Sequence, residues 1–142
     1  MTITDPVATI NAHRSPTVIS LGGRAIAYDS ASGRLELAFD VADQFANRAN
    51  AVQGGIVAAM LDAAMGVAAA VGHAQMTNVP TLDISVSYLR ATPLGELRCI
   101  GEIVRASRRV VFAESSLCTP DGVVTARGRS TLLLPAESAL RT

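Results

Sequence analysis

Short segments in which hydrophobic and polar residues alternate make up much of this chain. In residues 33–40, Leu35, Leu37 and Phe39 fall on one side, and the charged residues Arg34, Glu36 and Asp40 fall on the other. A repeat of two residues is typical of a strand with one buried face. The pattern predicts further strands in residues 81–90, 97–105, 110–118 and 123–134, and a shorter one within residues 17–28.

The segment 81–90 alternates most regularly. Its hydrophobic residues are Leu82, Ile84, Val86 and Tyr88, and the residues between them are Thr81, Asp83, Ser85 and Ser87. Because successive side chains of a strand point to opposite faces, this alternation predicts Thr81 on the face opposite to Tyr88.

Turn residues separate the predicted strands after residue 80. Pro93 and Gly95 precede one strand, Ser107 and Arg108 the next, and the run Pro120 to Gly122 the last. We expect hairpins at these turns, and hairpins join antiparallel strands. The pattern predicts an α+β fold, with an antiparallel sheet curled around a central helix.

The central helix is predicted from a long segment without alternation. From Gly55 to Val71, every residue except Asp62 is Ala, Val, Ile, Leu, Met or Gly. Such a helix is apolar all round and is therefore expected to be buried. The segment approaches the length of about 18–20 residues that spans a membrane, but its central acid and its lack of basic flanks argue against a span.

Asp62 is the one charge in this helix. Desolvating an ionised carboxylate is costly unless it is paired, so Asp62 caps a loop, pairs with an arginine or has a chemical role. The residues three and four positions away share its face, and they are Ala58, Ala59, Met65 and Gly66. Three of these four are small, which leaves room beside the carboxylate for a ligand.

Length and composition indicate one globular domain. The chain has 142 residues, of which 49% are hydrophobic and 17% charged, and its 12 basic residues balance its 12 acidic ones. A net charge of zero gives no general attraction to nucleic acid, and it suggests surface buried between copies of the chain. We expect a flexible N-terminal arm over residues 1–16, the domain over 17–136 and a tail over 137–142.

Cysteine and histidine give no sign of a metal site. Cys99 and Cys118 lack metal-ligand spacing and are predicted to be reduced core thiols. The two histidines are His13, in the arm, and His73, at the helix end. The first ten residues lack the pattern of a secretory signal, so the cytoplasm is the expected location.

The residues from Asn47 to Gly72 carry a resemblance. Asn47, then Gly54 and Gly55 opening a helix, then Asp62 eight residues after Gly54, resemble the signature of hotdog-fold acyl-CoA thioesterases of the phenylacetic-acid-degradation type, which are related to one class of 4-hydroxybenzoyl-CoA thioesterases. The likeness continues to about residue 135. In one departure, Gln53 stands where the family usually has His.

The resemblance implies hydrolysis of an acyl-CoA, with coenzyme A as part of the substrate and no separate cofactor. It implies that Asn47 helps to hold the substrate carbonyl or the attacking water, and that the Thr81 hydroxyl orients that water beside Asp62. It also implies homodimers or homotetramers with sites at the interface. No nucleic acid or membrane partner is expected.

The residues themselves support two roles. The Gly54 and Gly55 N–H groups are early, unpaired donors at a helix N-terminus and could stabilise an oxyanion. Asp62 is the candidate nucleophile or general base, because the chain has no Gly-x-Ser-x-Gly elbow and a carboxylate in apolar surroundings is a better base than a solvated one. Whether Asp62 attacks directly or activates water stays open.

Further residues are predicted to bind substrate. Gln53 is expected to fix the loop that presents the Gly54 N–H, with its carbonyl starting the helix and its side chain tied to residues 47–50. Gly55 lets the substrate approach the backbone closely. Cations for the coenzyme A phosphates are expected from a cluster at strand ends. The predicted substrate-binding residues are Gln53, Gly55, Met65, Arg90, Arg108 and Arg109, with Arg105 in the same cluster.

The spacing of Gly54 and Asp62 predicts a shared site. Eight positions along a helix correspond to a rise of about 12 Å, whereas an oxyanion donor and an attacking group must both reach one carbonyl. We therefore expect Gly54 from one subunit and Asp62 from another. A protein that binds acyl-CoA without cleaving it, or a hydratase, is the alternative, although hydration would require an acid and a His together.

Overall fold

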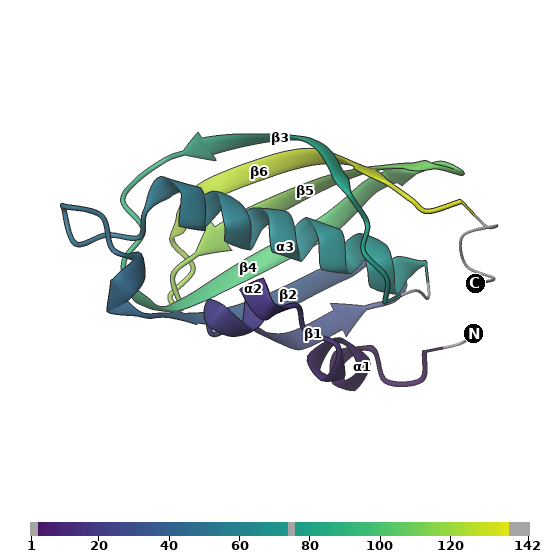
Figure 1. The fold of residues 1–142 in the computed structure, drawn as a ribbon, viewed down its shortest axis with the longest axis horizontal. Coiled ribbons are helices and arrows are strands. Elements are labelled where there is room, and N and C mark those ends of the chain that lie inside the picture. Colours follow the sequence, from purple (N-terminus) through teal and green to yellow (C-terminus); the bar gives the residue numbers. More distant parts are fainter. Residues whose placement is uncertain (1–2, 74–75, 137–142) are drawn as a thin grey trace.

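A six-stranded antiparallel sheet curls around one long helix in the computed structural model, which describes residues 3–73 and 76–136 (Figure 1). The α+β hotdog architecture predicted from the pattern and the resemblance is confirmed. The elements are α1 (Pro6–Ala12), α2 (Pro16–Ser20), β1 (Arg24–Asp29), β2 (Arg34–Val41), the 3-10 turn η1 (Asp43–Phe45), α3 (Gly54–Gly72), β3 (Thr81–Tyr88), β4 (Gly95–Ala106), β5 (Val110–Cys118) and β6 (Val124–Leu133).

The strand order is β1-β2-β4-β5-β6-β3, so β3 lies at one edge of the sheet, beside β6. The predicted hairpin between β3 and β4 is therefore wrong. β4 is paired on one side with β2 and on the other with β5, which leaves it no free edge for β3. The residues around Pro93 instead carry the chain from the edge of the sheet to its interior.

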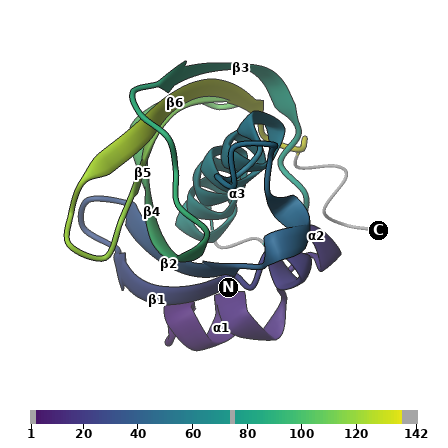
Figure 2. The same cartoon turned by 90° about the vertical axis from the view of Figure 1, so that its left-hand side faces the viewer.

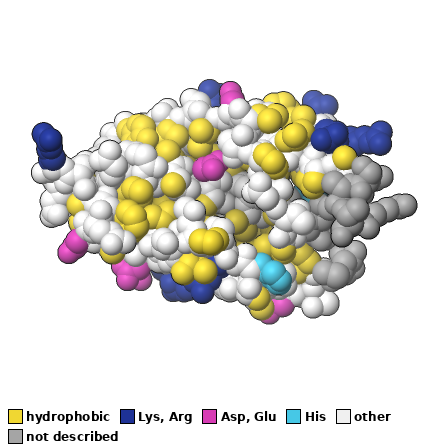
Figure 3. Space-filling view, viewed as in Figure 1, with side chains coloured by type: hydrophobic (Ala, Val, Ile, Leu, Met, Phe, Trp, Pro, Cys, Tyr) yellow, Lys and Arg dark blue, Asp and Glu magenta, His cyan; other side chains and the backbone are white. Residues whose placement is uncertain are grey.

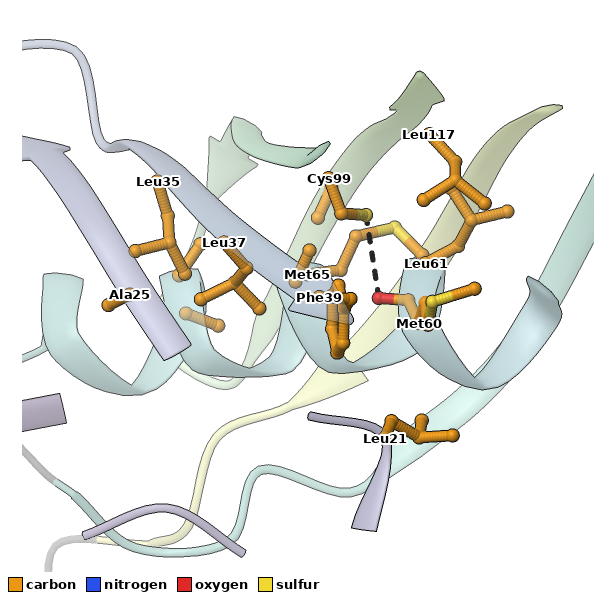
Figure 4. Packing of buried hydrophobic residues seen from close by; sticks show 14 of the residues in the cluster. Leu21, Ala25, Leu35, Leu37, Phe39, Met60, Leu61, Met65, Cys99 and Leu117 are labelled. Carbon is orange, nitrogen blue, oxygen red and sulfur yellow. Dashed lines mark hydrogen bonds between the residues drawn. The ribbon is translucent and has the colours of Figure 1, made fainter. Parts of the chain in front are cut away.

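The core lies between α3 and the concave side of the sheet, which wraps the helix (Figure 2). Leu35, Leu37 and Phe39 of β2 are at most 1% exposed, which confirms the alternation read in residues 33–40. They pack with α3 residues such as Met60 and Leu61 (Figure 4). By length and composition alone α3 could cross a membrane, but half of its 18-residue apolar window is buried inside the fold, as in the core helix of a folded domain.

Two glycines let α3 approach the sheet closely. A Cβ at Gly101 of β4 would lie 2.7 Å from the carbonyl carbon of Ala64, and a Cβ at Gly128 of β6 would lie 3.3 Å from the Cβ of Leu61. Backbone atoms at Ala64 cannot swing aside as the end of a side chain can. The short distance between the helix and the sheet therefore depends on glycine at position 101, which has no Cβ.

Gly101→Ala is expected to destabilise the fold by about 1–3 kcal/mol, the usual cost of overpacking a core. Gly66→Ala is the matched control within α3, because nothing lies within 4 Å of a Cβ built there. It should gain roughly 0.5–1 kcal/mol through lower chain entropy. Urea unfolding of both variants checks this, and equal stability of the two would refute the close-approach argument.

The N-terminal segment contains a capped helix, α1, that contacts the sheet. Asp5 caps α1 by accepting a hydrogen bond from the Ala8 N–H, and Ile10 is only 3% exposed. The Asn11 side-chain amide donates to the Ala25 carbonyl at 3.0 Å and accepts from the Ala25 N–H at 2.8 Å. This amide covers backbone groups of the edge strand β1 and holds α1 against it. The flexibility expected of residues 1–16 stays a prediction.

Both cysteines are free and buried, as predicted. Burial raises the pKa of the Cys99 thiol, and the nearby Cys118 raises it further. Burial also raises the pKa of Cys118, an effect that Glu36 increases and Arg98 opposes. Because the thiolate is the reactive form, neither cysteine is suited to act as a nucleophile at neutral pH.

Candidate active site

Asp62 and Thr81 are brought together, although 19 positions separate them in the chain. The Thr81 hydroxyl donates a hydrogen bond to Asp62 Oδ1 at 2.7 Å. Asp62 is half-buried on the face of α3 that points away from the sheet, and Thr81 is the first residue of β3. The bond holds one carboxylate oxygen in place and leaves Oδ2 with no hydrogen bond within the described residues.

A bulge makes this contact possible. Strict alternation predicts Thr81 and Tyr88 on opposite faces, but the pairing of β3 with β6 shifts register between Thr81 and Asp83. Thr81 then pairs with Leu132 and Tyr88 with Ala126, and both partners are fully buried side chains of the inner face of β6. Thr81 therefore faces the helix, and the predicted polar-face position is wrong because a bulge reverses the faces.

A cavity of about 570 Å³ opens beside Asp62. One wall is the outer face of α3, where the small residues Ala59, Ala63, Gly66 and Ala70 line it. The other walls are residues 76–81, before and at the start of β3, and residues of the segment 10–18. The prediction that small neighbours leave room beside the carboxylate agrees with this cavity.

Met65 does not belong to this face, which corrects the prediction that it contacts substrate. Its side chain is fully buried, and the Ser130 hydroxyl of β6 donates to its Sδ at 3.2 Å. Met65 lies among the buried hydrophobic side chains of the core (Figure 4). The turn of the helix between positions 62 and 65 is enough to direct Met65 to the sheet while Asp62 lines the cavity.

The N-terminus of α3 presents free backbone donors. The Gln53 carbonyl accepts hydrogen bonds from the Ile56 and Val57 N–H groups and so starts the helix, as predicted. The N–H groups of Gly54 and Gly55 have no acceptor within the described residues, and no side chain caps this end. Such N–H groups, at the positive end of the helix dipole, favour negative charge.

The loop before α3 is held by Asn47 rather than by the Gln53 side chain. Asn47 Oδ1 accepts from the Ala49 N–H at 2.9 Å and from the Ala51 N–H at 3.1 Å. The Gln53 side chain is exposed and makes no hydrogen bond within the described residues. The predicted hydrogen bonding of that side chain to residues 47–50 is therefore wrong. Asn47 already accepts hydrogen bonds from the backbone N–H groups of this loop.

Tyr88 is a candidate residue that sequence reasoning missed. Its hydroxyl donates to the Gly54 carbonyl at 2.7 Å, and its ring would lie 3.6 Å from a Cβ at Gly54. The side chain is nevertheless 55% exposed. An aromatic residue on an edge strand, seven residues after Thr81, was the available signal, but pattern alone did not show that it reaches the helix N-terminus.

The predicted arginine cluster does not form within one chain. The Arg90 N–H donates to the Thr125 carbonyl at the start of β6, whereas the Arg109 side chain donates to the Leu134 carbonyl just beyond its end. Nine residues of strand separate those carbonyls by about 30 Å. Arg108 and Arg105 lie near Arg109, so Arg90 is at the opposite end of the sheet.

No group of three or more His, Cys, Asp or Glu side chains in the described ranges could hold a metal ion. His73 lies at the C-cap of α3, as expected, and its Nδ1 bonds the Ala69 carbonyl at 2.9 Å. His13, by contrast, lines the Asp62 cavity. That placement puts an imidazole and an acid around one cavity, which sequence reasoning did not anticipate.

A curled antiparallel sheet around a central helix, with a helix-borne acid beside a cavity, defines a hotdog-fold protein. The thioesterase superfamily model matches residues 49–126, more than half of the chain. The chain belongs to the thioesterase superfamily, and this membership supports thioester hydrolysis as its general chemistry.

Individual relatives agree with the family. A candidate esterase of Halobacterium salinarum is 34% identical over 97 residues, which span 65% of this chain and 64% of that protein, somewhat less than two thirds of its length. A phenylacetic acid degradation-related protein of Ralstonia eutropha JMP134 has 27% identity and a TM-score of 0.81, covering 92% of this chain and 100% of its own. A Streptococcus mutans UA159 protein bound to acetyl CoA shares the fold, with 18% identity, a TM-score of 0.69 and coverage of 79% and 87%.

Proposed function

We propose that this protein hydrolyses an acyl-CoA, or a similar acyl thioester, to a free acid and a thiol. The observation that carries the proposal is the Thr81–Asp62 hydrogen bond beside a cavity on a helix whose first N–H groups are free. The acetyl CoA bound by the structurally similar S. mutans protein supports coenzyme A as the thiol. Coenzyme A is then part of the substrate, and the residues require no further cofactor for the reaction.

Asp62 supplies the nucleophile or the general base in this proposal. Thr81 holds Oδ1, so Oδ2 is the oxygen available to take a proton from water or to attack the thioester carbon. Attack produces a tetrahedral oxyanion, which the Gly54 N–H stabilises, with Gly55 beside it. Collapse of the intermediate expels the thiolate, and in the direct-attack route water then hydrolyses the acyl-aspartyl anhydride.

The site is proposed to combine two subunits. Gly54 and Asp62 are eight positions apart in α3, which is about 12 Å along the axis and too far for one carbonyl. β3 pairs with β6 on one side, and its other edge has no partner strand within the described residues. Ile84 and Tyr88, on the helix side of β3, are 38% and 55% exposed. A second copy related by a two-fold axis would cover these side chains and bring its Gly54 toward Asp62.

Tyr88 acts as a positioning residue in this arrangement. Its hydrogen bond to the Gly54 carbonyl fixes the peptide at the start of α3 and thereby the direction of the neighbouring donors. Asn47 contributes in the same way, because its side chain shapes the loop that leads into Gly54. Its Nδ2 has no partner within the described residues and remains available to a substrate carbonyl or a water.

Hydration of an unsaturated acyl-CoA is the second candidate function. One observation favours it, namely that His13 and Asp62 line the same cavity. Addition of water to a double bond uses an acid and a base at one site, and these two side chains could supply them.

A panel of saturated, aromatic and α,β-unsaturated acyl-CoA esters tests both candidates. We expect at least one ester to release its thiol, which a thiol reagent detects. The absorbance of a conjugated thioester should fall only when thiol is released. Loss of that absorbance with the thioester intact would identify a hydratase. Binding of the esters without either reaction would identify a binding protein.

A further inference from the structure

The segment from Ile10 to Val18 closes one side of the Asp62 cavity. Ile10, His13, Arg14, Ser15, Thr17 and Val18 of this segment all line it. Figure 3 shows the face that carries α3, where most charged side chains lie near the margin and hydrophobic side chains are spread over the area between them. Apart from His13, Asp62 and Arg14 are the two ionisable side chains among the described residues of the cavity lining, one acidic and one basic.

The Arg14 guanidinium is anchored but not neutralised. Its Nε donates to the Asn11 carbonyl at 3.3 Å and its Nη1 to the Gly23 carbonyl at 3.0 Å. Both acceptors are neutral, and no carboxylate lies within 4 Å of Arg14 in the described part of the chain. A guanidinium has five N–H donors, so three remain for a ligand.

The groups next to Arg14 can also donate hydrogen bonds. The His13 Nδ1 faces the Thr9 carbonyl at 2.9 Å, which leaves Nε2 unpaired within the described residues. Ser15 Oγ accepts from the Val18 N–H at 3.2 Å and keeps its hydroxyl proton for another partner. This part of the lining is thus basic and polar.

The rest of the cavity lining is largely apolar. Ile10, Val18, Val67, Ala70 and Val79 contribute to it. A largely apolar lining that also includes the Asp62 carboxylate and an anchored guanidinium matches a ligand with an apolar body and one anionic end. The Asp62 charge repels an anion placed next to it, so the anion is favoured at Arg14.

We propose that Arg14, assisted by His13, binds an anionic group of the thioester substrate in the cavity that Asp62 also lines. The proposal rests on the proposed function. The anion is a carboxylate at the far end of the acyl group or a phosphate of coenzyme A, and both present oxygens that a guanidinium binds through paired N–H groups. Arg14 then determines substrate selection rather than the chemical step.

The test measures binding of non-hydrolysable thioether analogues to the full chain by calorimetry. Four analogues combine a six-carbon acyl group, with or without a terminal carboxylate, with coenzyme A or with N-acetylcysteamine, which has no phosphate. Arg14→Gln is compared with Arg24→Gln, an exposed arginine of β1 that does not line the cavity. Arg14→Lys keeps the charge, and thermal unfolding shows whether each variant is folded.

Arg14→Gln is expected to weaken binding at least tenfold for the analogues that carry the recognised anion and less than twofold for the others. Weakening that follows the terminal carboxylate identifies the acyl end, and weakening that follows coenzyme A identifies a phosphate. Arg14→Lys should keep most of the affinity, and Arg24→Gln should keep all of it. The wild-type protein should itself prefer the analogues that carry that anion.

Three results would overturn the inference: no wild-type preference for either anion, equal weakening of all four analogues in Arg14→Gln, or no weakening at all. Equal weakening would mean that Arg14 only joins α1 and α2 to Gly23. These results are distinct from failure of the proposed function. If the proposed function fails, the wild-type protein will bind the analogues but will not cleave the corresponding thioesters.

Discussion

Asp62→Asn is expected to lower thioester hydrolysis by about 100-fold or more, the usual loss when a general base is removed. The amide oxygen of Asn can still accept the Thr81 hydroxyl, so the local geometry should be kept. The variant should also fold and assemble normally, because an amide is less costly than a carboxylate in a partly buried position. Thiol release with the best ester of the panel measures the activity, and size-exclusion chromatography measures assembly.

Asp83→Asn is the matched control for this substitution. Asp83 is exposed and lies on β3 only two residues after Thr81, but the bulge directs it to the other face of the sheet. The Asp83→Asn variant should hydrolyse the ester at the wild-type rate. Near wild-type turnover in Asp62→Asn would remove Asp62 from the mechanism, and equal losses in both variants would indicate a general effect of charge.

Mixing two inactive variants is expected to restore about a quarter of the wild-type activity if the site is shared between subunits. The variants are Gly54→Val, which places a side chain over the oxyanion donor, and Asp62→Asn. Random reassortment makes half of the dimers mixed, and each mixed dimer has one site with both Gly54 and Asp62 intact. A Cβ at Gly54 makes only ordinary contacts, at 3.5 Å from the Tyr88 hydroxyl, so the valine variant should fold.

The measurement requires reversible dissociation, for example in low concentrations of urea, followed by an assay of thiol release. A mixture that is never dissociated serves as the control and should stay inactive. Failure to recover activity, with mixed dimers demonstrated by differently tagged subunits, would show that each site lies within one chain. Mixed dimers that do not form at all would instead show that the subunits do not exchange.

Local patterns in the sequence determined the elements and the position of the acid. The alternation of Leu35, Leu37 and Phe39 is visible because only one face of a strand is buried. The apolar run after Gly55 predicts the buried helix, and Asp62 is conspicuous within it because an ionised group is costly there. These features depend on neighbours within a few residues, so the sequence alone was sufficient.

The tertiary structure decided which distant residues meet. Whether Thr81 faces Asp62 depends on a bulge in the pairing of β3 with β6, which no alternation in β3 alone reveals. The placement of β3 at the sheet edge, the contact of Tyr88 with Gly54 and the inclusion of Arg14 in the Asp62 cavity are likewise set by long-range packing. Such contacts are absent from the sequence pattern because the energy that fixes them comes from partners far along the chain.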